Sequence, residues 1–255
     1  MLEHVLADPS ALLIFACIGF AAQLVDGALG MAFGQISSTI LISIGVPPAA
    51  ASAGVHTAET FTTAVSAVSH VAHRNVDWSL FFRLAIPGVV GGVLGAYILT
   101  TIDASVAKPF VLVYLTALGL YLFYRGVMHR HTERTPKIVS PLGLVGGFLD
   151  AAGGGGWGGI VTSNLLVQGS NPRKTIGTVN TAEFFVTVTI AGTFLAALGW
   201  QAVTTATVGL LIGGVSAAPF GAWIAKRVNA DTLLTFVGAL LTAVSCFGLY
   251  RVIMS

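Results

Sequence analysis

Four carboxylates lie inside long apolar runs, where an ionised group is costly. Asp26, Glu59, Asp150 and Glu183 are four of only ten Asp and Glu residues among 255. At the centre of a bilayer, an ionised carboxylate costs about 2.5–3.5 kcal/mol even on insertion scales. Two interpretations follow: these groups bind protons or a coupling cation, or they brace and cap helices by hydrogen bonding to nearby backbone groups.

Glu59 belongs to a polar stripe with a spacing of 4, 3, 4, 3 and 4 residues, which places its members on one helix face. The stripe consists of Ser52, His56, Glu59, Thr63, Ser66 and His70. Ser and Thr in such stripes often do no more than join membrane helices. His56 precedes Glu59 by one turn and could share a proton with it, so we place it with the four acids as a candidate for ion or proton coupling.

Glycine-rich segments follow two of the acids and interrupt their apolar runs, at 26–34 and 150–159. A half-helix that begins at mid-membrane points free N–H groups and a partial positive charge inward, as an anion site needs. The alternative is that the glycines permit tight helix contact. On the first interpretation, neutral donors near the breaks and on the following helices bind the substrate: Gln35, Ser37, Ser38, Thr57, Thr162, Ser163, Asn164, Asn180 and Thr181.

The composition indicates the class of protein that carries these groups. Hydrophobic residues make up 55% of the chain and charged residues 9%, against about 25% charged residues in a soluble domain. This predicts a helical protein that crosses the bilayer several times, and the net charge of +2 gives no reason to expect a nucleic-acid partner. Motifs for a serine hydrolase, a phosphate-binding loop or a zinc protease are absent, so we expect neither an enzyme nor a bound cofactor or metal. Cys17 and Cys246 lie in apolar runs and are expected in the core.

The chain resembles itself at an offset of 124 residues. This offset places Asp26 on Asp150, Glu59 on Glu183 and Gly34 on Gly158, while His56 falls on Asn180, which cannot titrate. The matches predict a first repeat over residues 1–125, a basic linker over 126–140 and a second repeat over 141–255. If protons are handled, the two repeats are not expected to handle them equivalently.

Each repeat divides into five apolar segments. In the first they cover residues 10–26, 35–46, 49–72, 79–100 and 104–125, and in the second 138–150, 159–168, 172–198, 203–225 and 230–251. The last three of each repeat have about the 20 residues needed to cross a hydrocarbon core of about 30 Å. The first two are shorter, which predicts two half-helices or two very short spans on either side of a glycine-rich break.

Basic residues set the expected orientation, because they are enriched in cytoplasmic loops. They cluster at Arg74, in the linker, at Arg173 and Lys174, and at residues 226–227. All these sites are cytoplasmic if the repeats are inserted upside down relative to each other and each short pair makes no net crossing. Both termini are then extracytoplasmic, although Arg251 argues against this. The predicted fold is an all-α polytopic membrane protein of two inverted-topology repeats, each a glycine-broken short helix pair followed by three full transmembrane helices, as in secondary transporters.

The sequence resembles the TauE/SafE family of sulfite exporters over residues 12–251. The resemblance depends on the segments Gly19–Gly34 and Gly143–Gly159, on the Gly-x-Pro-Pro turn at 45–48, and on the basic mid-chain linker. It implies movement of sulfite, sulfoacetate or another small sulfur-containing or organic anion across the cytoplasmic membrane.

These observations together predict a secondary transporter of a small anion that works by alternating access and is coupled to a proton or sodium gradient. The expected partners are the anion, the coupling ion (H⁺ or Na⁺) and the lipid bilayer, and a homodimer is an assembly that the sequence allows. Two alternatives stay open: a channel-like pore for a small anion, and a cation carrier that uses the buried carboxylates.

Overall fold

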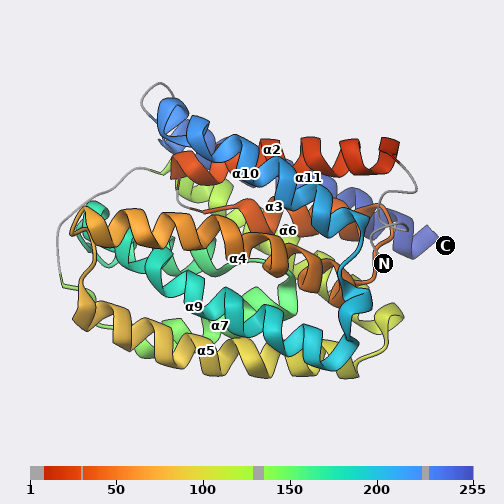
Figure 1. Cartoon of the computed structure of the whole chain (residues 1–255), viewed down its shortest axis with the longest axis horizontal. Coiled ribbons are helices and arrows are strands. Elements are labelled where there is room, and N and C mark those ends of the chain that lie inside the picture. Colours follow the sequence, from red (N-terminus) through yellow and green to blue (C-terminus); the bar gives the residue numbers. More distant parts are fainter. Residues whose placement is uncertain (1–8, 30, 129–134, 226–229, 255) are drawn as a thin grey trace.

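The computed structural model describes residues 9–29, 31–128, 135–225 and 230–254, and every regular element in these ranges is helical. Figure 1 shows long helices packed side by side in one bundle. The part that corresponds to the first repeat contains α2 (Pro9–Leu29), α3 (Phe33–Ser43), α4 (Pro48–Ala72), α5 (Trp78–Thr101) and α6 (Ala104–Val127). The part that corresponds to the second contains α7 (Ser140–Gly153), η1 (Gly158–Thr162), α8 (Ser163–Val167), α9 (Pro172–Leu198), η2 (Trp200–Ala202), α10 (Thr205–Ala225) and α11 (Ala230–Met254).

Local capping signals explain why the predicted segment boundaries agree closely with these helices. Asp77 accepts hydrogen bonds from the backbone of Ser79 and Leu80 at the start of α5, and Asp103 caps α6 in the same way. Pro48 and Pro172 occupy the first turns of α4 and α9, where the missing N–H has no intrahelical partner to lose.

The first segment is longer than predicted. We expected an end at residue 26, but α2 continues through Asp26 to Leu29 and contains 21 residues, enough to cross a bilayer at 1.5 Å per residue. Its counterpart α7 has 14 residues. The two opening helices therefore differ in length, and each Asp lies within the last turn of its helix, not at the boundary.

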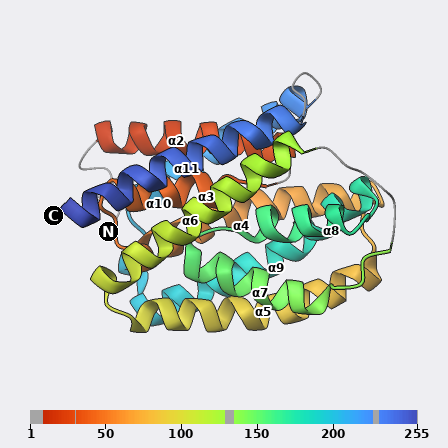
Figure 2. The same ribbon diagram turned by 180° about the vertical axis from the view of Figure 1, so that it is seen from behind.

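The main helix contacts join the two halves of the chain. The most extensive are those of α2 with α10, α6 with α11, α5 with α7, and α4 with α9. Figure 1 shows α2 and α10 along one edge of the bundle and α5 with α7 along the other, with α4 and α9 between them. In this view α4 and α9 run in opposite directions, as do α5 and α10. Figure 2 shows α6 and α11 side by side on the opposite face.

Glycines allow two of these pairs to approach closely. A Cβ atom on Gly91 of α5 would meet the backbone of Leu144 and Phe148 in α7. A Cβ atom on Gly213 of α10 would meet the backbone of Ala16 and Phe20 in α2 in the same manner. Such contacts let dispersion forces act between helix backbones, which is how helices associate in lipid.

The distribution of polar groups is that of a membrane protein. Large apolar side chains such as Val68, Phe110 and Ile253 are exposed, while His56 and Glu59 are buried. Among the described residues, five helices are long and apolar enough to cross a membrane: α2, α5, α6, α9 and α11. The prediction for the cysteines was wrong, because Cys17 and Cys246 are both exposed on the outside of the bundle.

Several basic segments meet at one end of the bundle, at the left of Figure 1. Lys174 Nζ donates to the carbonyl of Arg74 at 2.9 Å, and the N–H of Lys137 donates to Gln168 Oε1 at 3.0 Å. The α4–α5 turn, the described end of the linker and the α8–α9 turn are therefore neighbours. Predictions for residues 129–134 and for Lys226 and Arg227 lie outside the described residues.

The glycine contacts give a test of the packing. Gly91→Ala adds a methyl group against the α7 backbone, and we expect destabilisation of about 1–3 kcal/mol from overpacking. Gly192→Ala in α9 is the matched control, because its Cβ would have no neighbour within 4 Å. Thermal unfolding in detergent should show a lower melting temperature for Gly91→Ala and an unchanged or higher one for Gly192→Ala. Equal melting temperatures would contradict the close α5–α7 packing.

Candidate functional site

The two glycine-rich breaks touch each other inside the bundle. A Cβ atom on Gly34, at the start of α3, would lie 3.1 Å from the Cα of Gly155. Gly154 and Gly155 have φ angles of 74° and 139°, a region that side-chain-bearing residues rarely adopt. The hydroxyl of Ser38 donates to the carbonyl of Gly154. The α3 helix is thus held against the second glycine-rich break.

Each break is closed by the aspartate that precedes it. Asp26 Oδ1 accepts a hydrogen bond from the N–H of Phe33 at 3.4 Å, and Asp150 Oδ1 accepts one from the N–H of Trp157 at 2.9 Å. The donor follows the acid by seven residues in both cases. The aspartates therefore bind the backbone groups that open the next half-helix, where the helix dipole favours negative charge.

The two glutamates complete the same arrangement from the neighbouring long helices. The Glu59 carboxylate on α4 lies against Gly34, whose Cβ would be 3.5 Å from both of its oxygens, and Glu183 on α9 has Gly158 as its backbone neighbour. Both side chains are buried, with exposures of 4% and 5%. Two carboxylates therefore lie at each break, an aspartate from the preceding helix and a glutamate from the following long helix, α4 or α9.

His56 departs from this symmetry. Its Nε2 lies 3.3 Å from Asp150 Oδ2, which joins α4 to α7 of the other half. Its Nδ1 lies 2.8 Å from the carbonyl oxygen of Ser52, an atom that can only accept, so Nδ1 carries a hydrogen. One further proton must then lie between Nε2 and the carboxylate, which makes the His56–Asp150 pair neutral as a whole.

The acids are close enough to act on one another. Glu59 interacts electrostatically with Asp26, Asp150 and His56, and Glu183 interacts with the other three acids. Lys and Arg do not occur among the charged partners of Asp26, Glu59 and Glu183. We refer to Asp26, Glu59, Asp150, Glu183 and His56 as the acid cluster. Within the described ranges, no group of three or more His, Cys, Asp or Glu residues has a metal-binding arrangement.

Three of the predicted substrate donors have polar atoms that are buried without a hydrogen-bond partner. They are Gln35 Nε2, Ser37 Oγ and Thr162 Oγ1, on side chains no more than 2% exposed. A Cβ atom on Gly159 would lie 2.6 Å from Gln35 Nε2, so this amide reaches from α3 to the second break. An unpaired buried donor costs about 1–3 kcal/mol, which a polar ligand would recover.

Four of the other predicted donors are already bonded, and one of them is Ser38, described above. Thr57 donates to Ala53 at 2.7 Å, Thr181 donates to Gly177 at 2.7 Å, and Asn164 donates to Ile160 at 2.7 Å. All three bonds stay within the local helix. Ser163 and Asn180 are buried, with exposures of 3% and 5%.

Tyr114 of α6 is part of the site but was not predicted. Its hydroxyl donates to the carbonyl of Gly155 at 3.3 Å, and its ring occupies the space that a side chain on Gly153 or Gly156 would need. The repeat gave no signal, because the register resumes at an offset of 126 residues in this part of the chain, and the corresponding position there holds Leu240. Proximity to a glycine-rich break is visible only in the folded chain.

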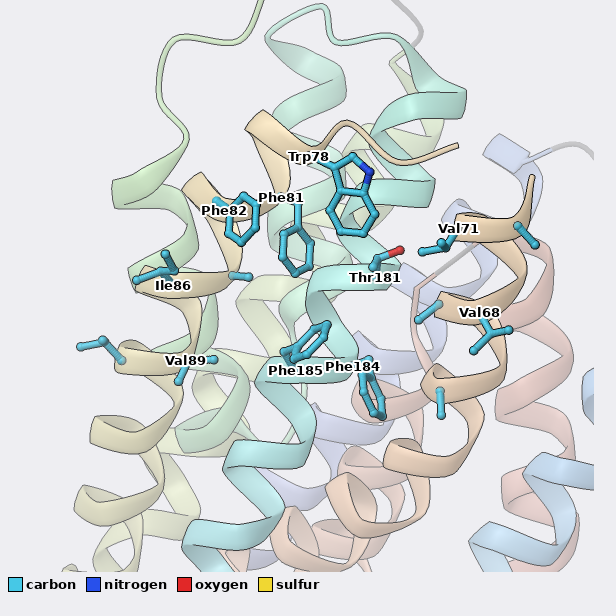
Figure 3. A pocket seen from close by; sticks show the side chains of 15 residues that line it. Val68, Val71, Trp78, Phe81, Phe82, Ile86, Val89, Thr181, Phe184 and Phe185 are labelled. Atoms are coloured by element: carbon cyan, nitrogen blue, oxygen red, sulfur yellow. The ribbon is translucent and has the colours of Figure 1, made fainter. Parts of the chain in front are cut away.

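A separate groove opens on the side of the bundle between α4 and α5, with α9 as its floor (Figure 3). Its volume is about 980 Å³, and its walls include Val68, Trp78, Phe82 and Phe185. Thr181 is the polar residue in this lining, and its hydroxyl is bonded to its own helix. The groove is lined almost entirely by hydrocarbon and shares no residue with the acid cluster.

Comparison with known proteins agrees with this architecture. The family model described as "Sulfite exporter TauE/SafE" matches residues 15–247. A "Probable membrane transporter protein YtnM" from Bacillus subtilis is 42% identical over 92% of this chain and 81% of its own length. A "Probable membrane transporter protein" from Haemophilus influenzae is 26% identical over 83% of this chain and 84% of its own length.

A more distant relative carries the family name itself. "Sulfite exporter TauE/SafE family protein 3" from Arabidopsis thaliana is 22% identical over 44% of this chain and 23% of its own length. No solved structure matches the chain. The family match covers both glycine-rich breaks and the acid cluster. The chain is a membrane transporter, not an enzyme, and belongs to the TauE/SafE sulfite exporter family.

Proposed function

We propose that this protein is a secondary transporter of a small anion such as sulfite, sulfoacetate or a related organosulfonate, coupled to a proton or sodium gradient. The observation that carries the proposal is the acid cluster at the contact of the two breaks, beside the unpaired donor of Gln35. It brings groups that can take up a proton or cation next to groups that can bind an anion. The substrate class follows the names of the family and of its Arabidopsis member.

Alternating access would arise from two inverted repeats over residues 1–125 and 141–255, joined by the linker 126–140. The contacts support this, because the first helix of each half packs on the fourth of the other, α2 on α10 and α7 on α5. The opposite directions of α4 and α9 in Figure 1 are those of inverted units. Two such units can exchange conformations and open a central site to either side in turn.

The proposed orientation places the basic end of the bundle in the cytoplasm and both termini outside the cytoplasmic membrane. The neighbouring positions of Arg74, Lys137 and Lys174 support this, because basic residues are retained on the cytoplasmic side. The acidic N-terminal segment agrees with it, while Arg251 lies near the other end of the chain. We also propose that the protein can form a homodimer, for which we assign no contact surface.

Asp26, His56, Glu59, Asp150 and Glu183 are the proposed ion-coupling residues, and the two repeats differ in this role. The His56–Asp150 pair holds its own proton, while the corresponding Asn180 has no titratable group. Glu59 and Glu183 are therefore the stronger candidates for exchange of H⁺ or Na⁺ during transport. Of the predicted substrate donors, Gln35, Ser37 and Thr162 have polar atoms without a hydrogen-bond partner. We propose that these three, and not the other predicted donors, bind the anion.

A second candidate function is a cation carrier. It is favoured by one observation, the absence of Lys and Arg among the charged partners of Asp26, Glu59 and Glu183. A buried group of acids without a basic partner attracts cations more readily than anions.

Flux measurements separate these functions. In proteoliposomes, we expect an imposed proton or sodium gradient to drive labelled sulfite, and Glu59→Gln with Glu183→Gln to reduce that flux at least about tenfold, equivalent to about 1.4 kcal/mol. Asp103→Asn, an exposed helix cap, is the control and should transport normally. Gradient-driven flux that persists in the double variant would refute the coupling assignment. Sulfite flux indifferent to both gradient and variant would indicate a pore, and ²²Na⁺ flux without an anion would indicate the carrier.

Orientation is tested by labelling single cysteines in a background without Cys17 and Cys246. With a membrane-impermeant maleimide, we expect Trp200→Cys to react in intact cells. Trp200 is exposed, and the α9–α10 connection that contains it lies at the end of the bundle opposite the basic segments. Arg74→Cys and Lys137→Cys should react only after permeabilisation. Labelling of Arg74 and Lys137 from different sides would reject the proposed topology.

The asymmetry is tested by breaking the inter-repeat pair. His56→Asn leaves Asp150 buried without its proton donor, and removal of one partner from a buried pair typically costs about 3–5 kcal/mol. We expect a lower melting temperature in detergent that His56→Asn with Asp150→Asn largely restores. His73→Asn, an exposed histidine one residue after α4, should have no effect. A single variant as stable as the original protein would show that the pair does not join the repeats.

A further inference from the structure

The start of α3 is already occupied by carboxylates that have the chemistry of the proposed substrate. Asp26 accepts from the N–H of Phe33, and both Glu59 oxygens lie 3.5 Å from where a Gly34 Cβ would be. Backbone N–H groups at a helix start are the donors that a half-helix offers to an anion. Gln35 Nε2 follows in the same turn, is 98% buried and has no partner. The site therefore has a donor that the present carboxylates leave free.

Resting on the proposed function, we propose that Glu59 and the transported oxyanion compete for the position beside the Gly34 N–H at the start of α3. Protonation of Glu59 releases the Gly34 N–H, the anion binds there and to Gln35 Nε2, and deprotonation expels it. The ligand class is an anion with two or three oxygens on one central atom, because such a group presents acceptors as a carboxylate does.

Charge balance requires this coupling. The groups that act on Glu59 come from several helices: His56 from α4, Asp26 from α2, Asp150 from α7 and Glu183 from α9. The His56–Asp150 pair is neutral as a whole, so Asp26, Glu59 and Glu183 contribute the remaining negative charge. Described residues of α3 and α10, which also pack on α4, have no ionisable side chain, and Tyr114 of α6 faces Gly155.

An additional anion would therefore enter a buried group of negative charges without Lys or Arg to offset it. Uptake of a proton by Glu59 removes one negative charge at the moment that the anion adds one. The total charge of the cluster stays constant. The Glu59 carboxylate and the substrate anion are never both at the Gly34 N–H and Gln35 Nε2. The predicted linkage is one proton taken up for each anion bound.

Calorimetric titration of the full-length protein in detergent tests this linkage, with sulfite and methanesulfonate as probes. Methanesulfonate does not titrate in the accessible pH range, so any pH dependence of its binding belongs to the protein. We expect the Kd of the original protein to rise about tenfold per pH unit above the titration of Glu59. Buffers of different ionisation heat should report uptake of one proton per anion.

Variants assign the linkage to Glu59. Glu59→Gln has nearly the same shape without the charge, so its Kd should be independent of pH and close to the tightest value of the original protein. Glu183→Gln and the exposed control Asp103→Asn should keep the slope. Gln35→Leu removes the free donor and should weaken binding about tenfold or more at every pH, with the slope unchanged.

The outcomes separate this inference from the proposed function. Anion binding that is independent of pH in the original protein, or a slope that survives in Glu59→Gln, overturns the competition and leaves anion transport intact. If Glu59→Gln does not fold, an unchanged Kd in Gln35→Leu overturns the assignment of the site to α3. If neither probe binds to the original protein or to folded variants, both the competition and the proposed anion substrate fall.

Discussion

The site depends on the hydrogen bonds between buried carboxylates and the backbone N–H groups that open the broken helices. A helix that starts inside the bundle leaves its first N–H groups without partners, in a medium where water does not supply them. Asp26 binds the N–H of Phe33 on α3, and Asp150 binds that of Trp157, while the Glu59 carboxylate lies against Gly34. These bonds have two effects. They give the unpaired N–H groups an acceptor, and they place the carboxylates where the helix dipole favours negative charge.

The glycines make these bonds geometrically available. Gly34 and Gly155 allow the two breaks to touch, and glycines on α5 and α10 bring α7 and α2 close enough to hold the breaks in place. Tyr114 packs on the second break and bonds its backbone. The rigid outer helices thus position a central region whose backbone is irregular, which a membrane tolerates where the irregular part is buried in protein.

The acid cluster also explains why the two halves differ although their architecture is alike. His56 joins Asp150 across the halves and neutralises it, and the matching Asn180 lacks this chemistry. If both halves exchanged protons in the same way, each would need the same titratable groups, and Asn180 in place of a histidine does not provide them. The unpaired donor of Gln35 lies in the first turn of α3, next to Gly34 and the Glu59 carboxylate, which is why we propose this half as the anion site.

The sequence by itself determined the class of protein, the helix boundaries and the duplicated acids, because these follow from local composition, capping residues and a repeat visible at a fixed offset. Pro48, Asp77 and Pro172 mark helix starts without any tertiary information. Only the tertiary structure decided which groups meet: the His56–Asp150 pair joins residues 94 positions apart, and Tyr114 has no repeat counterpart. It also decided that the half-helix N–H groups are occupied by carboxylates and are not free, since burial and hydrogen-bond partners depend on how distant segments pack, which spacing along the chain does not encode.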